Sequence, residues 1–237
     1  MWSTLVTFEI GWRAPLHVRT EQVGTRAGSC RIAYVSDIHL RRGRSGRLAA
    51  NVIAAVRRCA ADLVLLGGDL VDARSEVPAL TALVQQLAEL SPVYAVAGNH
   101  DERLGAERVR DAVRAGGGCW IQKTVATLAH RGRQIAVGGP EVAQFPVADV
   151  RVLCAHHPRS WRRARRLGCD LVLAGHLHGC QIVAFEFRDR LFPGALFYPG
   201  NCLRRQSGNT QLVVSRGVSD LVPVRWRCPR EVVLCQV

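Results

Sequence analysis

Residues that can bind metal ions recur along the chain directly after short apolar segments. Runs such as residues 32–35 and Leu63–Leu66 have the composition of buried strands, and polar side chains follow them. The polar set contains two aspartates, one asparagine and five histidines: Asp37, His39, Asp69, Asn99, His100, His156, His176 and His178. Because ligands gather at the carboxyl ends of strands in open α/β sheets, these side chains are expected at one rim of the fold.

The residue types favour a site for two metal ions over a site for one. Imidazole together with carboxylate is a ligand set that suits zinc, iron and manganese. The histidines, carboxylates and amide would crowd a single ion, but they fit two ions if one carboxylate bridges them. Paired ions about 3.5–4 Å apart stabilise the attacking and leaving oxygens of an in-line displacement at phosphorus. Any one of these residues alone would fit a turn or a capped surface position, so the prediction depends on the whole ordered set.

The segments between these residues predict an α/β fold. Apolar residues at helical spacing over 46–60 and 77–90 separate the strands expected at 32–35, 63–66 and 93–96. This order implies a parallel sheet with crossover helices. A third helix is expected over 103–116 and a fourth over 158–167. The remaining segments read as strands: 119–122, 125–129, 134–137, 150–154, 170–174, 181–187, 195–198, 211–215 and 231–235. A single domain over 1–237 is expected, with 1–30 as a peripheral segment containing an outer strand at 6–12.

Five segments resemble the calcineurin-like metallophosphoesterase family, in its bacterial stand-alone branch. They occur in order within residues 31–180: Asp37-Ile38-His39, Gly68-Asp69-Leu70-Val71-Asp72, Gly98-Asn99-His100-Asp101, His156 followed by Pro158, and Gly175-His176-Leu177-His178. Two later segments strengthen the resemblance to the bacterial branch: 179–182 and 214–217. The resemblance implies an α/β fold, namely a four-layer αββα sandwich of two mixed sheets flanked by helices, with a dinuclear metal site at the strand C-terminal ends.

The resemblance also implies a role for each residue of the set. One metal ion would be held by three side chains: Asp37, His39 and His178. The other would be held by three more: Asn99, His156 and His176. Asp69 would bridge the two ions, which would be manganese, iron or zinc, and a bridging water or hydroxide would be the nucleophile. His100 would be the general acid to the leaving oxygen, and Asp72 would orient it.

Three features depart from the family pattern. Cys180 stands where relatives of this branch often have glycine, within Gly-Gly-Gln. Residues 138–141 stand where many relatives have a Gly-x-x-Asp loop. His157 occupies a spacer position between His156 and Pro158, where it is either a contact of the site or a bystander. These departures concern the substrate side of the pocket and leave the expected metal centre intact.

Composition indicates a globular protein with anionic partners. Lys+Arg is 32 against Asp+Glu 19, which gives a formal net charge of +13, and nearly all of the excess is arginine. Such a balance favours phosphorylated substrates, an anionic membrane surface or nucleic acid, unless it reflects a general bias toward arginine. The nine cysteines are scattered and odd in number, which is typical of buried thiols in a reducing compartment. No signal peptide or membrane span is evident, so a cytoplasmic protein is expected, peripheral on the inner membrane face at most.

Three features bear on the substrate. Arg41, Arg42 and Arg44 follow the first metal-binding segment and are predicted to bind the substrate phosphate or an anionic head group. Residues 160–167 form a basic amphipathic helix that either lies on a membrane or packs Trp161 inward. No long insertion separates the motifs, which leaves an open pocket for a bulky substrate.

The resemblance implies a nucleotide-linked lipid as the leading specific substrate, namely UDP-2,3-diacylglucosamine, whose pyrophosphate is cleaved in lipid A synthesis by single-domain relatives. Two alternatives within the family stay open: a nuclease and a cyclic-nucleotide phosphodiesterase. A third alternative is a non-catalytic scaffold that binds a protein, although the whole metal-binding set is intact. No obligate protein partner is evident from the sequence.

Overall fold

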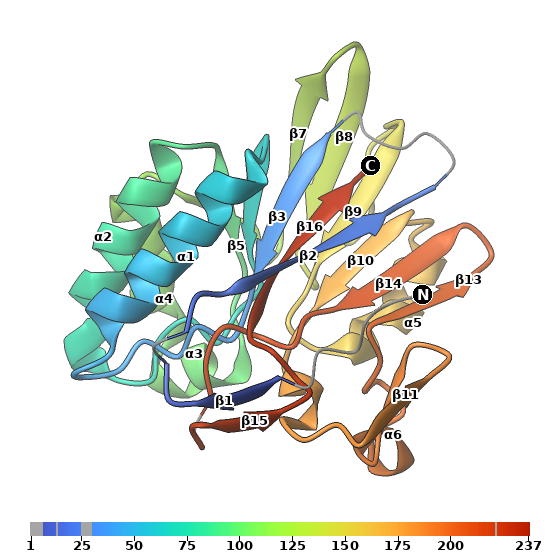
Figure 1. Cartoon of the computed structure of the whole chain (residues 1–237). Helices are drawn as coiled ribbons and strands as arrows, with labels where there is room; N and C mark the ends of the chain where they lie inside the picture. The colour runs from blue at the N-terminus through green and yellow to red at the C-terminus, as the bar shows by residue number, and fades with distance from the viewer. Residues whose placement is uncertain (1–6, 13, 25–29, 221) are drawn as a thin grey trace.

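Two six-stranded mixed sheets pack face to face, with helices against their outer faces (Figure 1). The computed structural model describes residues 7–12, 14–24, 30–220 and 222–237. The layer order α, β, β, α confirms the predicted fold class. The two helical layers are unequal, because three of the longer helices cover the first sheet and one short helix covers the second.

The first sheet is built around strands that are buried on both faces. Its strands, in spatial order, are β2 (His17–Gln22), β16 (Glu231–Gln236), β3 (Arg31–Val35), β4 (Leu63–Leu66), β5 (Val93–Ala95) and β6 (Cys119–Trp120). β3 to β6 run parallel, whereas β16 is antiparallel to β3. The continuous apolar sequence of β3 and β4 matches their position between helices and the second sheet.

The second sheet has a parallel centre and antiparallel edges. Its strands, in spatial order, are β13 (Arg204–Ser207), β14 (Thr210–Val214), β10 (Leu171–Ala174), β9 (Val150–Cys154), β8 (Arg133–Gly138) and β7 (Val125–His130). Two small antiparallel pairs lie outside both sheets: β1 (Phe8–Ile10) with β15 (Val224–Trp226), and β11 (Phe185–Phe187) with β12 (Arg190–Phe192). The strand expected at 6–12 is therefore shorter in the described residues, and Val6 lies outside them.

The helices bury their apolar faces against the sheets. The first sheet is covered by α1 (Ser45–Cys59), α2 (Val77–Ala88) and α4 (Ala106–Ala115), with η1 (Arg74–Glu76) leading into α2. In α1, Leu48, Val52 and Val56 recur at helical spacing and are buried. The remaining helical segments are α3 (Asn99–Leu104), η2 (Pro158–Ser160), α5 (Trp161–Arg166), η3 (His178–Cys180) and α6 (Gly194–Phe197).

A shared apolar core joins the two sheets. Side chains from β3 and β4 of the first sheet meet side chains from β9 and β10 of the second, among them Tyr34, Leu65, Val152 and Leu173. The Tyr34 hydroxyl donates a 2.7 Å hydrogen bond to the carbonyl of Ala155, directly after β9. This hydrogen bond therefore fixes the end of β3 in the first sheet against the end of β9 in the second.

Several expected elements differ from the observed ones. The helix expected over 103–116 is two helices, because Gly105 takes a positive φ of 111° between α3 and α4. The strand expected at 195–198 is wrong, since α6 forms there after Pro193. The edge strands β2 and β13 were not expected, because half-exposed polar sequences such as Arg204–Ser207 lack an apolar alternation.

Two further expectations concern the cysteines and membrane-spanning segments. All nine cysteines are unpaired thiols, and seven of them are buried, which matches the interpretation as small apolar residues. Within the described ranges, no helix combines the length and apolar character needed to cross a bilayer.

Candidate metal centre

The predicted set of polar residues converges on one rim of the sandwich. Asp37 and His39 follow β3, Asp69 follows β4, and Asn99 and His100 begin α3 after β5. The second sheet supplies three histidines after β9 and β10: His156, His176 and His178. Because β3 to β5 belong to one sheet and β9 and β10 to the other, the site spans the gap between the two sheets.

One donor group forms around the end of β3. His39 Nε2 lies 3.4 Å from His178 Nε2, and His178 Nε2 lies 3.5 Å from Asp37 Oδ1. Ligand atoms around a tetrahedral ion, with bonds of about 2.0–2.2 Å, lie roughly 3.4 Å apart. The three atoms therefore have the spacing of ligands that face a common cation.

A second donor group forms around the end of β9. His156 Nε2 lies 3.1 Å from His176 Nδ1, 3.2 Å from Asn99 Oδ1 and 3.3 Å from Asp69 Oδ2. The same carboxylate oxygen of Asp69 lies 3.9 Å from His39 Nε2 in the first group. Asp69 thus stands between the two groups, where a bridging carboxylate is required, and the donor set fits two cations.

Polar contacts behind the histidines fix which ring nitrogen faces the centre. The carbonyl of Gly67 accepts from His156 Nδ1 at 3.0 Å, so the Nε2 lone pair is left for a cation. Asp72 Oδ1 lies 2.8 Å from His39 Nδ1, and Asp220 Oδ1 lies 2.9 Å from His178 Nδ1. Such partners orient ligating histidines and raise the basicity of their other nitrogen.

Asp72 also orients His100. Its Oδ1 lies 2.9 Å from His100 Nδ1, while Arg41 donates to its Oδ2 at 2.6 Å. The His100 side chain keeps 25% of its surface exposed, whereas His39 keeps only 2%. The ring of His100 is therefore fixed at one nitrogen and open to solvent elsewhere, as a residue in contact with substrate would be.

The electrostatics of the site favour positive charge among the carboxylates. Burial alone would lower the pKa of His156, but its hydrogen bond to Asp69 and the nearby carboxylates raise that pKa to about 9. Burial opposes ionisation of Asp72, yet hydrogen bonds from His39 and Arg41 hold its pKa at about 2. The same kinds of contact lower the pKa of Asp69 despite its burial. Divalent cations would replace these protons on binding.

Backbone strain is concentrated at the candidate ligands. Five of them have positive φ angles: Asp37 (56°), His39 (48°), Asp69 (51°), His176 (74°) and His178 (50°). This region is unfavourable for side chains other than glycine, so such residues persist where the surrounding structure holds them, often at functional sites. A Cβ at Gly98 would overlap Asp69, and one at Gly175 would overlap Asp37. The glycines of the motifs thus let the ligand loops approach closely.

Two aspartates outside the predicted site help to build it. Asp101 is fully buried and accepts backbone N–H groups from Leu70, Val71 and Gly98, which ties the loop after β4 to the start of α3. Burial raises the pKa of Asp101 to about 7. Asp220 supports His178 and is itself paired with buried Arg225, with Nε to Oδ2 at 2.6 Å. Asp101 could have been found from its motif, but Asp220 follows no motif.

The predicted substrate arginines lie in different surroundings. Arg41 is engaged with Asp72, and the Arg44 guanidinium stacks 3.3 Å above the centre of the Trp12 ring. Arg42 is exposed beside them. The role of all three in binding substrate stays a prediction, and Arg41 already donates a hydrogen bond that orients Asp72.

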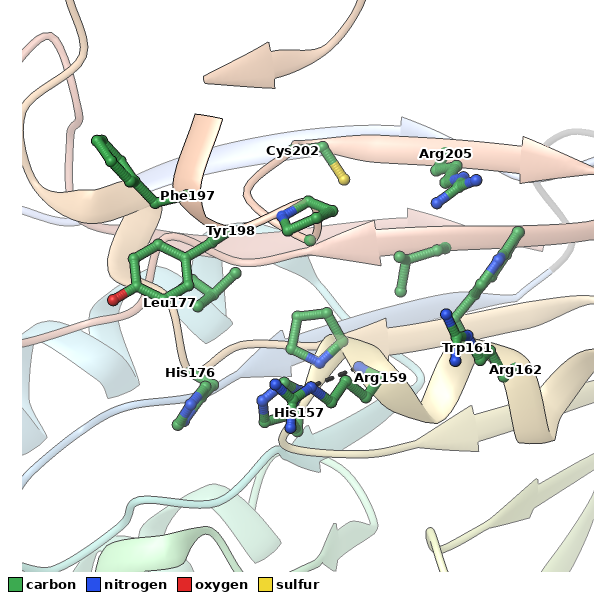
Figure 2. Close-up of a pocket in the computed structure, with 14 residues that line it drawn as sticks. His157, Arg159, Trp161, Arg162, His176, Leu177, Phe197, Tyr198, Cys202 and Arg205 are labelled. Carbon is green, nitrogen blue, oxygen red and sulfur yellow. Dashed lines mark hydrogen bonds between the residues drawn. The ribbon is translucent and has the colours of Figure 1, made fainter. Parts of the chain in front are cut away.

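A cavity of about 680 Å³ adjoins the centre at His176 (Figure 2). The cavity lining is largely apolar and contains several arginines. Residues of η2 and α5 line one side, and the end of α6 with the segment that follows it lines the other. The lining includes Pro158, Arg159, Trp161, Arg162, Leu177, Phe197, Tyr198 and Arg205. His157 also lines it. Its ring is tilted by 33° to that of His176, with the ring centres 4.4 Å apart, and its Nδ1 accepts the Arg159 backbone N–H. His157 is therefore in contact with the site.

Comparison with known proteins decides the family. The model of the calcineurin-like phosphoesterase superfamily domain matches residues 30–216, which include every candidate ligand. The chain belongs to the calcineurin-like phosphoesterase superfamily. This confirms the resemblance found in the sequence motifs, and the protein is a metal-dependent phosphoester hydrolase. Family members typically bind two metal ions, and the two donor groups described above fit that number.

The relatives of this phosphoesterase are distant in sequence. Phosphodiesterase YaeI of Escherichia coli K12 is 27% identical and covers 97% of this chain and 90% of its own length. An uncharacterized metallophosphoesterase of Helicobacter pylori J99 is also 27% identical, covering 85% of this chain and 58% of its own length. Among solved structures, TT1561 of Thermus thermophilus aligns with a TM-score of 0.50 at 13% identity, covering 81% and 91% of the two chains. That structural likeness supports the fold.

Proposed function

We propose that this phosphoesterase hydrolyses a phosphodiester or pyrophosphate bond with two divalent cations bound at the rim. The main support is the position of Asp69, whose Oδ2 faces His156 of one donor group at 3.3 Å and His39 of the other at 3.9 Å. In this assignment one ion is bound by Asp37, His39 and His178. The second is bound by Asn99, His156 and His176. Asp69 contacts both.

The bound ions would neutralise phosphate oxygens and lower the pKa of a water molecule, which makes it a nucleophile at neutral pH. Manganese, iron and zinc all suit this mixture of imidazole and carboxylate. The protein holds the donors in place through Gly67, Asp72 and Asp220, so that they need not reorganise when substrate binds.

His100 is proposed as the general acid. Its Nδ1 is held by Asp72, so its exposed ring edge can donate a proton to the leaving oxygen. The carboxylate of Asp72 thereby holds the His100 ring in one orientation, in the way an aspartate orients a catalytic imidazole. Arg41 completes this arrangement by fixing the other oxygen of Asp72.

The proposed specific substrate is UDP-2,3-diacylglucosamine, bound at a membrane surface. The cavity beside His176 supports this choice, because aromatic and aliphatic side chains suit acyl groups while Arg159, Arg162 and Arg205 suit anionic groups. Simple phosphodiesters are the broader class of substrate, which agrees with the name of the Escherichia coli relative, a phosphodiesterase.

A hydrolysis panel with added manganese tests the proposal. It contains bis-p-nitrophenyl phosphate, p-nitrophenyl phosphate, cyclic nucleotides, single-stranded DNA and UDP-2,3-diacylglucosamine. We expect turnover of the diester and the pyrophosphate, and loss of both metal and turnover in Asp69→Ala. Preference for DNA would favour the nuclease, and preference for cyclic nucleotides would favour the cyclic-nucleotide phosphodiesterase. Absence of bound metal and of all turnover would favour the protein-binding scaffold.

A further inference from the structure

Five large apolar side chains are exposed in one stretch of the chain near the cavity. Phe185 and Phe187 on β11 keep 53% and 58% of their surface exposed. Leu196, Phe197 and Tyr198, at the end of α6, keep 70%, 75% and 54%. Single exposed apolar residues are ordinary, but a contiguous group of this size marks a surface that contacts a partner. We call these five residues the apolar corner.

Contacts through β12 make the apolar corner one surface. The rings of Phe185 and Phe192 stack with centroids 4.8 Å apart, which joins β11 to β12. Arg190 Nη2 donates to the carbonyl of Ala195 at 2.7 Å, which joins β12 to α6. Figure 1 accordingly draws β11 and α6 next to each other at one lower edge of the molecule.

The charge around the apolar corner is positive. Exposed arginines accompany it from three segments: Arg159, Arg162, Arg188, Arg190 and Arg205. The Arg188 guanidinium lies 5.2 Å from the centre of the Phe187 ring. Residues 185–198 contain two acidic residues, Glu186 and Asp189. Asp189 is paired with Arg204 at 3.0 Å, so its charge is offset by that arginine. Exposed aromatic and aliphatic side chains interleaved with arginine suit the interface of an anionic bilayer.

The cavity connects the apolar corner to the metal centre. Phe197 and Tyr198 belong to the corner and also line the cavity, whose inner side reaches His176 (Figure 2). A bilayer in contact with α6 would therefore meet the cavity mouth. By contrast, Trp161 of the basic helix α5 is buried with 6% exposure, so α5 can offer a membrane only its arginines.

We propose that the apolar corner docks the protein on an anionic lipid bilayer and so presents the cavity to lipid-borne phosphates. This docking proposal rests on the proposed function, because the bilayer would deliver lipid-borne substrate to the same metal centre. It assigns membrane contact to β11 and α6, whereas the sequence had offered the basic helix at 160–167 as one of two possibilities.

Vesicle co-sedimentation of the full chain tests the docking. The vesicles are phosphatidylcholine alone, or phosphatidylcholine mixed with phosphatidylglycerol. The test variant is Phe187→Ser with Leu196→Ser, neither of which lines the cavity or touches the metal centre. The matched control is Val147→Ser, because Val147 is 95% exposed and lies on the loop between β8 and β9. Thermal melting verifies that all three proteins are folded.

We expect the wild type and the control to bind the anionic vesicles, and the double variant to bind at least roughly tenfold more weakly, since two apolar side chains no longer enter the lipid. Turnover of soluble bis-p-nitrophenyl phosphate should be equal in all three proteins. Equal binding of variant and wild type, or no binding to anionic vesicles, would overturn the docking. Binding of the protein to single-stranded DNA, without binding to the vesicles, would also overturn the docking. Vesicle binding without any turnover would support the docking while refuting the proposed function.

Discussion

At the scale of single residues, one carboxylate organises both the metal ligands and the candidate acid. Asp72 contacts His39 Nδ1 at 2.8 Å and His100 Nδ1 at 2.9 Å, and Arg41 fixes its second oxygen. The same aspartate therefore sets the tautomer of a ligand and the direction of the residue that would meet the leaving group. Asp72 thus supports both metal binding, through His39, and the proposed proton transfer, through His100.

Replacing His100 should separate these two functions. We expect His100→Ala to keep its metal content and to lose turnover by roughly 10²–10⁴, the usual contribution of a general acid. Elemental analysis and turnover of bis-p-nitrophenyl phosphate measure the two quantities. His17→Ala is the control, because His17 is exposed at the start of β2 and is not one of the candidate ligands. Turnover of His100→Ala at the wild-type rate would show that His100 is not the acid.

Asp220 gives a second prediction at this scale. Its Oδ1 lies 2.9 Å from His178 Nδ1, and the ion pair with Arg225 fixes the position of the carboxylate. Asp220→Asn should weaken metal binding by roughly 10–100-fold, as loss of a carboxylate behind a ligating histidine does. Metal titration against a competing chelator measures the affinity. Asp189→Asn, which removes a carboxylate paired with Arg204 at the surface, should leave affinity unchanged. Equal affinities in both variants would exclude the support role.

The residues of the centre differed in how well sequence could find them. Asp37, Asp69 and His156 each follow an apolar strand, and parallel strands bring their ends to one rim, so local pattern sufficed. Asp220 lies beyond β14 in a loop with no periodicity, and only the path of the chain back past η3 brings it to His178. Contacts of that kind depend on tertiary packing, which local sequence does not encode.

At the scale of elements, packing decided what local pattern left open. Residues 195–198 are a short apolar run, as a strand can be, yet Gly194–Phe197 form one helical turn after Pro193. The basic helix was open to two interpretations, and α5 packs Trp161 and Ala164 against the second sheet beside Leu212. The helix spacing was predicted from sequence, but the identity of its partner surface required the fold.

The buried position of Trp161 predicts a stability effect. Trp161→Ala should lower the free energy of unfolding by about 3–5 kcal/mol, because it removes a large side chain from a packed layer. Arg166→Ala, on the exposed side of α5, should stay within about 0.5 kcal/mol of the wild type. Urea unfolding measures both. A small loss in Trp161→Ala would mean that the ring is not packed inward, and the helix would again be a candidate for membrane contact.

At the scale of the whole molecule, the two sheets are joined by charge as well as by their common core. Glu231 on β16 is fully buried and meets Arg19 of β2, with Arg19 Nε 3.2 Å from its Oε1. Arg216, directly after β14 of the second sheet, donates Nε to Glu231 Oε2 at 2.9 Å. Arg19 also donates to the Val214 carbonyl at 2.7 Å. This cluster ties the edge of one sheet to the end of a strand in the other.

Acid should loosen this connection in a defined range of pH. Burial alone would raise the pKa of Glu231, but the two arginines lower it from 4.5 to about 2. The folded state therefore holds its proton less tightly than the unfolded chain, and Glu231 stabilises the fold fully above pH 4.5. That contribution is lost progressively as the pH falls from 4.5 toward about 2.

Comparison of the wild type with Glu231→Gln isolates this effect from other groups that titrate in acid. The variant removes the carboxylate that Arg19 and Arg216 share, although Arg19 keeps its pair with Glu21, so at neutral pH it should be less stable by about 1.5–3 kcal/mol. Its disadvantage should shrink as the pH is lowered through the range in which the wild type protonates Glu231. Urea unfolding at a series of acidic pH values gives the difference directly, with Glu141→Gln as a control at an exposed carboxylate. A difference that stays constant with pH would mean that Glu231 has the same pKa in both states, and that the cluster does not join the sheets through charge.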